Sequence, residues 1–248
     1  MASSSHQPGI FQSARLYWRD VASRSGALAA ARGVAAALWE FFRDSTPSRL
    51  KSRFGDADYD WNFRVNTTSG AVPWRDRLLG VFHSPYQPTE PGLFREMVDV
   101  VEQHARLSEF TFIDLGSGKG RTLLMASDYP FKRIIGVELL PALNQVAEEN
   151  IATYKSDAQK CFSIESVCSD ATAFPLPDGP LLVFLFNPFP EAGLKTAVAH
   201  LEDSFRENSR PLIVVYHNPQ LEEVFKGGSA WEKIGGTHQY SIFRSKEY

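Results

Sequence analysis

The chain has 248 residues, 43% of them hydrophobic and 22% charged, with a net charge of -3. These values are ordinary for a globular protein and leave room for one sizeable α/β domain with an appendage. The small negative charge gives no whole-molecule indication of nucleic-acid binding. The charge is uneven, because residues 1–53 carry eight Lys or Arg against three acids, a balance of +5, which leaves -8 for the remainder.

Two cysteines, Cys161 and Cys168, have neither zinc-site nor CxxC spacing. We interpret them as inert thiols of a reducing compartment and expect a cytoplasmic protein. No membrane span is expected, because the best candidate, residues 26–42, is too short and carries Arg32 in its middle. It also lacks the clean apolar core of a secretory signal. The Arg-rich, acid-poor N-terminus leaves an organelle transit segment as an alternative.

The first third of the chain divides into two predicted segments. Residues 1–53 are predicted to be a basic helical extension, with one or two helices over 11–44 that end before Pro47. Residues 54–92 are rich in Gly, Pro, Asp and aromatic residues and are predicted to be an irregular cap or lid. Within them DADYD (56–60) imitates the start of a calcium loop but lacks its glycine and glutamate, so we interpret it as a solvated or capping segment.

From residue 93 to the C-terminus, apolar runs with strand character alternate with helical stretches. The helical stretches are 93–105, 119–127, 141–153 and 191–206. The strand-like runs are 110–115, 133–139, 161–167, 181–186 and 211–216, followed by WEKIGG and HQYSIFRS near the end. Such alternation predicts an α/β fold, a doubly wound, mostly parallel sheet with helices on both faces.

The stretch FIDLGSGKGRTLLMAS (112–127) is a glycine loop between a predicted strand and a predicted helix. It is not a phosphate-binding P-loop, which needs Ser or Thr after Gly-Lys and a glycine five residues before the second one. A dinucleotide fingerprint would need glycine where Arg121 stands, because that glycine permits close contact between helix and strand.

The loop does match the pattern acid-x-Gly-x-Gly-x-Gly, with Asp114, Gly116, Gly118 and Gly120. This pattern resembles motif I of the class I S-adenosylmethionine-dependent methyltransferases. The resemblance implies a Rossmann-like seven-stranded sheet with an antiparallel C-terminal strand over residues 93–248. It also implies that the loop, Ser117 included, holds S-adenosylmethionine while Asp114 accepts from its ammonium group. A tight structural turn is the alternative.

Two later acids fit the same resemblance in order and spacing. Glu138 ends the second predicted strand, where an acid can accept from both ribose hydroxyls. Asp170 in SDATAFP follows the third strand, where such an acid bonds the adenine amino group and Ala171 offers its backbone N–H. A solvated carboxylate is the alternative for Glu138, and a turn or helix cap is the alternative for Asp170.

The fourth predicted strand ends in FNPFP (186–190), where class I methyltransferases place residues that face the methyl acceptor. Asn187, Pro188 and Phe189 resemble the Asn/Asp-Pro-Pro-Tyr/Phe motif of amino-group methyltransferases but depart from it at the third position. Asn187 is the candidate to orient the acceptor, with Phe189 packing on it, and a Pro-terminated turn is the alternative. His217 follows the fifth strand as a further candidate for the acceptor pocket.

An upstream loop, SPYQPTEPG (84–92), resembles the loop that closes over the methionine moiety in seven-strand protein-lysine methyltransferases. Tyr86 and Thr89 are its candidates for cofactor contact, and a packed Pro-rich connector is the alternative. The six histidines show no metal-site spacing, so no metal is expected.

The resemblance implies an enzyme that moves a methyl group from S-adenosylmethionine to a nucleophile by in-line displacement. A protein amine leads as acceptor, a small molecule follows, and nucleic acid comes third because the body of the protein is acidic. Two other classes stay open: a non-catalytic module that binds the cofactor or serves as a scaffold, and a dinucleotide oxidoreductase.

Overall fold

The computed structural model describes residues 57–68, 87–226 and 230–246, with a few further positions between 18 and 35. Most of the predicted extension and of the 54–92 segment lies outside the described residues. Residues 1–57 and 68–87 group into one compact unit, and residues 58–67 and 88–248 group into another. The second unit contains the whole sheet.

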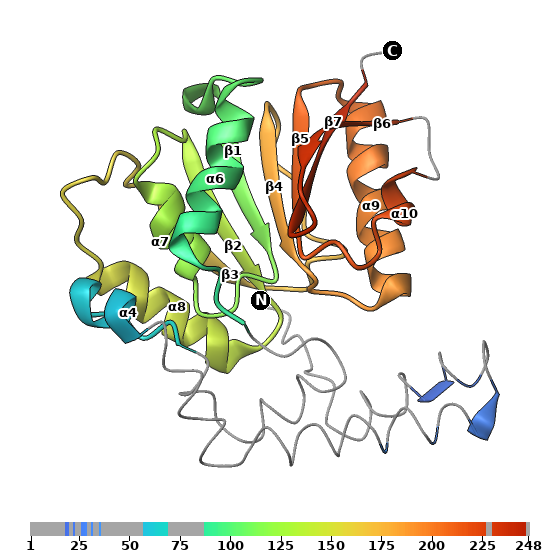
Figure 1. Ribbon diagram of the computed structural model, residues 1–248, viewed down its shortest axis with the longest axis horizontal. Helices are drawn as coiled ribbons and strands as arrows, with labels where there is room; N and C mark the ends of the chain where they lie inside the picture. The colour runs from blue at the N-terminus through green and yellow to red at the C-terminus, as the bar shows by residue number, and fades with distance from the viewer. Residues whose placement is uncertain are drawn as a thin grey trace, which may run out of the picture. The chain divides into compact units, whose positions relative to one another are not determined.

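A seven-stranded sheet in the order β3-β2-β1-β4-β5-β7-β6 forms the centre of this unit (Figure 1). The first five strands pair in parallel, and β7 is antiparallel to both of its neighbours, β5 and β6. The strands are β1 (Thr111–Leu115), β2 (Arg133–Glu138), β3 (Ile164–Cys168), β4 (Leu181–Phe186), β5 (Leu212–His217), β6 (Trp231–Gly236) and β7 (Tyr240–Ser245). The predicted mostly parallel sheet with an antiparallel strand near the C-terminus is confirmed.

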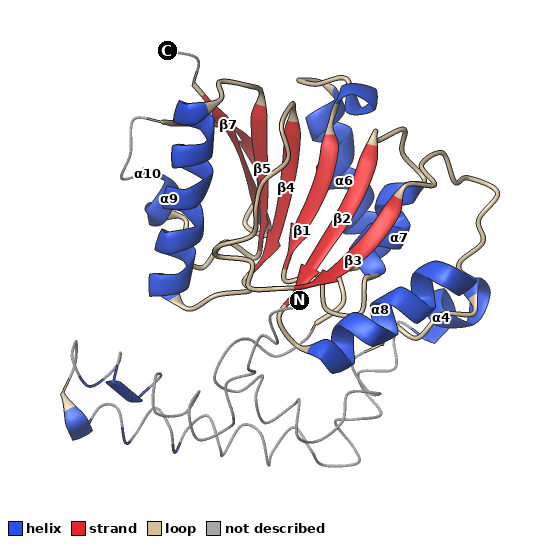
Figure 2. Ribbon diagram, turned by 180° about the vertical axis from the view of Figure 1, so that it is seen from behind, coloured by secondary structure: helices blue, strands red, loops and turns tan. Residues whose placement is uncertain are grey.

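Helices cover both faces of the sheet, as the two opposite views show (Figure 2). One face carries α6 (Pro91–Glu102) and α7 (Arg121–Ser127), and the other carries α9 (Glu191–Glu207) and the short α10 (Glu223–Lys226). Helix α8 (Pro141–Thr153) packs beside β3, a 3-10 turn spans Leu107–Glu109, and α4 (Ala57–Phe63) precedes the sheet in sequence. None of the described helices is long and apolar enough to cross a lipid bilayer.

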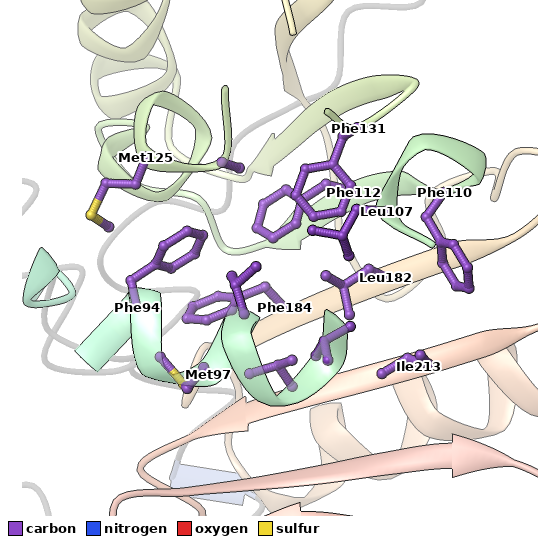
Figure 3. Close-up of a cluster of buried hydrophobic side chains, with 14 of the residues drawn as sticks. Phe94, Met97, Leu107, Phe110, Phe112, Met125, Phe131, Leu182, Phe184 and Ile213 are labelled. Atoms are coloured by element: carbon purple, nitrogen blue, oxygen red, sulfur yellow. The ribbon is translucent and has the colours of Figure 1, made fainter. Parts of the chain in front are cut away.

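Alternate residues of each central strand point into two separate cores. In the first, Phe112 of β1 lies among the rings of Phe94, Phe131 and Phe184, at centroid distances of 5.3 to 6.2 Å (Figure 3). In the second, Ile113 packs with residues of β4, β5 and α9. Because β4 is buried on both faces, its sequence LLVFLF is a continuous apolar run, and this run predicts a strand.

Most predicted elements lie within three residues of the observed ones, but the expectation that 54–92 is irregular is wrong at α4. Asp58 and Asp60 stand in its first turn, where negative charge complements the helix dipole. Tyr59 and Phe63, four residues apart, lie on one side of it with ring centroids 4.8 Å apart. This helix therefore has an aromatic side to bury, which the turn-rich composition around it concealed.

Candidate functional site

The glycine loop joins β1 to α7 at the carboxyl edge of the sheet. Gly116, Gly118 and Gly120 all have left-handed backbone conformations, with φ of 91°, 56° and 80°. The amides of Gly116 and Ser117 donate to the carbonyl of Val137 at 2.8 and 3.1 Å, which ties the loop to β2. A Cβ on Gly116 would lie 2.5 Å from Cβ of Pro188, so a side chain fits neither the conformation nor the space.

Asp114 lies at the base of this loop and is 3% exposed. Its carboxylate accepts a hydrogen bond from the hydroxyl of Thr122 in the first turn of α7. Burial raises the pKa of Asp114 to about 7, an effect that the Thr122 hydrogen bond opposes and the nearby charge of Glu138 adds to. The charge of this side chain therefore changes with pH in the neutral range.

Glu138 ends β2 and holds the loop from the opposite side. One carboxylate oxygen accepts from the amide of Gly118 and the other from the amide of Leu140, both at 2.8 Å. Burial raises the pKa of this carboxyl, and the backbone hydrogen bonds lower it. Each oxygen keeps a second lone pair, so the carboxylate can accept from two further hydroxyls.

Gly136, in the middle of β2, was not among the candidates from the sequence. A Cβ at this position would lie 2.5 Å from Cδ1 of Leu123 and 2.7 Å from Oγ of Ser117. Its bare backbone therefore lets the loop and α7 approach β2 closely. Ser117 Oγ is buried and has no hydrogen-bond partner among the described residues. A buried hydroxyl without a partner is expected where a polar ligand completes the site.

The carboxyl ends of β4 and β5 meet beside the loop. Asn187 follows β4 in a left-handed conformation with φ of 43°, and the hydroxyl of Tyr216 donates to its Oδ1 at 2.7 Å. Tyr216 itself is 1% exposed, whereas Asn187 is only partly buried. The amide of Asn187 is therefore held by a rigid neighbour and still reachable from outside.

His217 ends β5 beside the same edge. Its ring stacks on Phe186 at a centroid distance of 3.8 Å, and its Nδ1 lies 3.4 Å from Oγ1 of Thr89. Burial lowers the pKa of His217 to about 4, so the imidazole is neutral near pH 7. The structure thus brings together two candidates, Thr89 and His217, that are far apart in the sequence.

Four other candidates lie differently. Asp170 is exposed and its carboxylate accepts from the amide and hydroxyl of Thr172 at 2.9 and 2.7 Å, which closes a turn. Ala171, the next residue, is buried. Phe189 packs against the second core and lies next to Gly193 of α9. Tyr86 lies outside the described residues.

The residues at the loop fit the cofactor that the resemblance implies. Two buried carboxylates, Asp114 and Glu138, stand at the carboxyl ends of adjacent parallel strands, and Ser117 of the loop between β1 and α7 has a buried hydroxyl without a hydrogen-bond partner among the described residues. Ligands of open α/β sheets bind at this edge. No group of three or more His, Cys, Asp or Glu side chains that could hold a metal ion occurs in the part of the chain that the structure describes.

Comparison with protein families gives one match, to "Histone methylation protein DOT1", over residues 88–167. This range runs from before α6 to β3 and so contains the glycine loop and Glu138, but not the β4 end. No curated protein matches the chain.

Solved structures resemble part of this chain at low identity. A putative methyltransferase, yhhF, from Escherichia coli is 18% identical with a TM-score of 0.46, covering 66% of this chain and 90% of that one. A ribosomal protein L11 methylase from Lactobacillus delbrueckii is 15% identical, with a TM-score of 0.45, and covers 67% and 84%. A predicted N6-adenine-specific DNA methylase from Listeria monocytogenes is 14% identical, with a TM-score of 0.45; the match covers 62% of this chain and only half of that protein.

The fold assignment rests on this chain's own sheet order and loop, with which the family match agrees. The family match covers the glycine loop and Glu138, which are the residues that carry the resemblance to class I methyltransferases.

Proposed function

We propose that this enzyme methylates an amine nitrogen, with a protein side chain as the first candidate acceptor and a small molecule as the second. The family match favours a protein amine, because its description names histone methylation. The observation that carries the proposal is the amide of Asn187, held by Tyr216 at the carboxyl end of β4 next to the glycine loop. Nucleic acid stays the third candidate, because residues outside 1–53 carry a balance of -8.

In this proposal the cofactor lies along the carboxyl edge of β1 and β2. S-adenosylmethionine supplies a methyl group already activated by its sulfonium, so the protein mainly has to bind, align and exclude water. Asp114 accepts from the cofactor's ammonium group, and Glu138 accepts from the ribose hydroxyls with its remaining lone pairs. The complete set of proposed cofactor residues is Asp114, Gly116, Ser117, Gly118, Gly120, Glu138, Asp170, Ala171, Tyr86 and Thr89.

The acceptor is proposed to enter at the β4 and β5 ends. Because Tyr216 donates to Oδ1 of Asn187, the amide has one orientation, and the second lone pair of Oδ1 can accept from an amine N–H. The Cβ that Gly116 lacks would meet Pro188, so the acceptor loop and the cofactor loop are in direct contact. His217, neutral and stacked on Phe186, contributes an aromatic wall rather than a charge.

The test is transfer of labelled methyl from S-adenosylmethionine to histones, to other basic proteins and to a small-amine fraction, with RNA and DNA as comparison acceptors. Asn187→Ala should lower kcat for the amine acceptor without weakening cofactor binding. Asn208→Ala, an exposed asparagine at the end of α9, is the matched control. Label in nucleic acid alone, or equal rates in both variants, would overturn the proposal.

The other two classes make different predictions. A non-catalytic module would bind S-adenosylmethionine and transfer label to none of these acceptors. A dinucleotide oxidoreductase would bind NAD, but its motif needs glycine at the position of Arg121. The Arg121 side chain is buried and contacts Thr67 and Tyr59.

A further inference from the structure

Two cations inside the glycine loop are fully buried. Lys119 is 0% exposed and Arg121 is 1% exposed, and they stand on either side of Gly120. Burying a charge is costly unless it is paired and hydrogen-bonded. Burial lowers the pKa of Lys119 to about 8, and the charge of Asp60 opposes that shift. The conformation of the loop therefore depends on the groups that pair with Lys119 and Arg121.

The described partners of both cations come from residues 58–67, more than fifty positions earlier in the chain. Nε of Arg121 donates to Oγ1 of Thr67 at 2.6 Å, and its guanidinium lies 3.4 Å from Asp60 and 4.9 Å from the ring centre of Tyr59. Nζ of Lys119 donates to Oδ1 of Asn66 at 3.1 Å. Asp60, which the sequence suggested to be solvated or capping, is instead a partly buried counter-charge of Arg121.

The segment is also fixed from within and from α8. The carboxylate of Asp60 accepts from the amide of Thr67 at 2.7 Å and from its hydroxyl. Asn150 of α8 accepts from the amide of Asn66 at 2.7 Å and donates to the carbonyls of Asn66 and Lys119, at 3.1 and 2.9 Å. One buried amide thus joins the segment directly to the backbone of the loop.

The contacts of residues 58–67 agree with the way the chain divides into compact units. Residues 58–67 group with the methyltransferase unit, although the stretches on either side of them, 1–57 and 68–87, group with the other unit. Val137 and Glu138 of β2 hold the first part of the loop, whereas the side chains of Lys119 and Arg121 contact residues 58–67.

We propose that residues 58–67 form a clamp that positions the cofactor loop, with Asp60 and Asn66 as its positioning residues. The clamp holds Gly120 and the start of α7 in place through Arg121 and Lys119, so that the loop is ordered before S-adenosylmethionine arrives. A loop that is already ordered binds its ligand more tightly, because binding then loses less conformational entropy. The inference rests on the proposed cofactor site, but it concerns residues that the site itself does not contain.

The test uses the full chain and the variants Asp60→Asn and Asn66→Ala. Asp58→Asn is the matched control, since Asp58 is an exposed acid on the same helix. Hydrogen–deuterium exchange of amides 116–124 is measured in the free protein, and the Kd for S-adenosylmethionine is measured by calorimetry. We expect faster exchange in the loop, unchanged exchange in β4 and β5, and a Kd about tenfold higher for both variants, with wild-type values for the control.

The free-protein exchange measurement separates this inference from the proposed function. If the wild type binds no S-adenosylmethionine, the proposed function fails, yet the clamp is still tested by exchange at 116–124. Wild-type exchange in the loop of both variants would overturn the clamp, whatever the Kd values are. Should Asp60→Asn fail to fold, Asn66→Ala decides alone, because Asn66 is exposed and its replacement removes only the Lys119 contact.

Discussion

The hydroxyl of Tyr216 donates a 2.7 Å hydrogen bond to Oδ1 of Asn187, and this bond joins the carboxyl ends of β5 and β4. Tyr216 is held in turn by Phe225, whose ring centre lies 5.9 Å away, so the donor sits on a packed support. The amide of Asn187 is therefore oriented by a side chain of the core rather than by its own loop.

Tyr216→Phe should therefore impair transfer more than it impairs folding. The ring stays packed, and losing one hydrogen bond costs about 1 kcal/mol of stability. With the Asn187 amide free to rotate, we expect kcat to fall about tenfold or more while the Kd for S-adenosylmethionine stays constant. Transfer kinetics together with calorimetry check this, and an unchanged kcat would remove Asn187 from its proposed role.

Asp114 predicts a pH dependence of cofactor binding. Its pKa in the free protein is about 7, above the ordinary value for an aspartate, so the folded protein holds a proton there that the unfolded chain has lost. The associated stability is present at low pH and is lost as the pH rises through about 7. Because the ionised carboxylate is the form that accepts from an ammonium, affinity for S-adenosylmethionine should rise between pH 5.5 and 7.5.

Calorimetric titrations across that range measure the effect, and two variants identify its source. Asp114→Asn should bind weakly with little pH dependence. Thr122→Val removes the hydrogen bond that lowers the pKa of Asp114, so its binding midpoint should move to higher pH. A pH profile identical in wild type and Thr122→Val would show that another group titrates.

Gly136→Ala should displace the glycine loop, because Gly136 of β2 packs directly against it. The new methyl would overlap Leu123 and Ser117, and overpacking of this kind costs about 1 to 3 kcal/mol. We expect a lower melting temperature and weaker binding of S-adenosylmethionine. Thermal unfolding with and without the cofactor checks both. A variant with wild-type binding would mean that the loop does not depend on close contact with β2.

The aromatic cluster around Phe112 should contribute strongly to the stability of the unit. Phe112→Ala leaves a cavity among three rings and should lower the free energy of unfolding by about 3 to 5 kcal/mol. Phe162→Ala is the control, because Phe162 is 78% exposed and its removal should change stability by less than about 0.5 kcal/mol. Denaturant titration distinguishes them, and equal losses would contradict the assigned core.

The sequence alone predicted the strands of the sheet and drew attention to the residues at the strand ends. β4 was predicted with its observed bounds, because a strand buried on both faces is a continuous apolar run. Asp114 and Glu138 became candidates through the resemblance of their positions to class I methyltransferase motifs, and the structure places both at the carboxyl ends of adjacent parallel strands. What the sequence did not reveal depends on partners far away along the chain. Nothing local to Asp60 indicates that it neutralises Arg121, and nothing local to Gly136 indicates that Ser117 needs its space.

The most direct test of the account is calorimetric titration of the purified chain with S-adenosylmethionine, S-adenosylhomocysteine and NAD, alongside Asp114→Ala and Glu138→Ala. We predict micromolar binding of the first two ligands, no binding of NAD, and loss of binding in both variants. Binding of NAD, or binding of S-adenosylmethionine that both variants retain, would contradict the cofactor site described here.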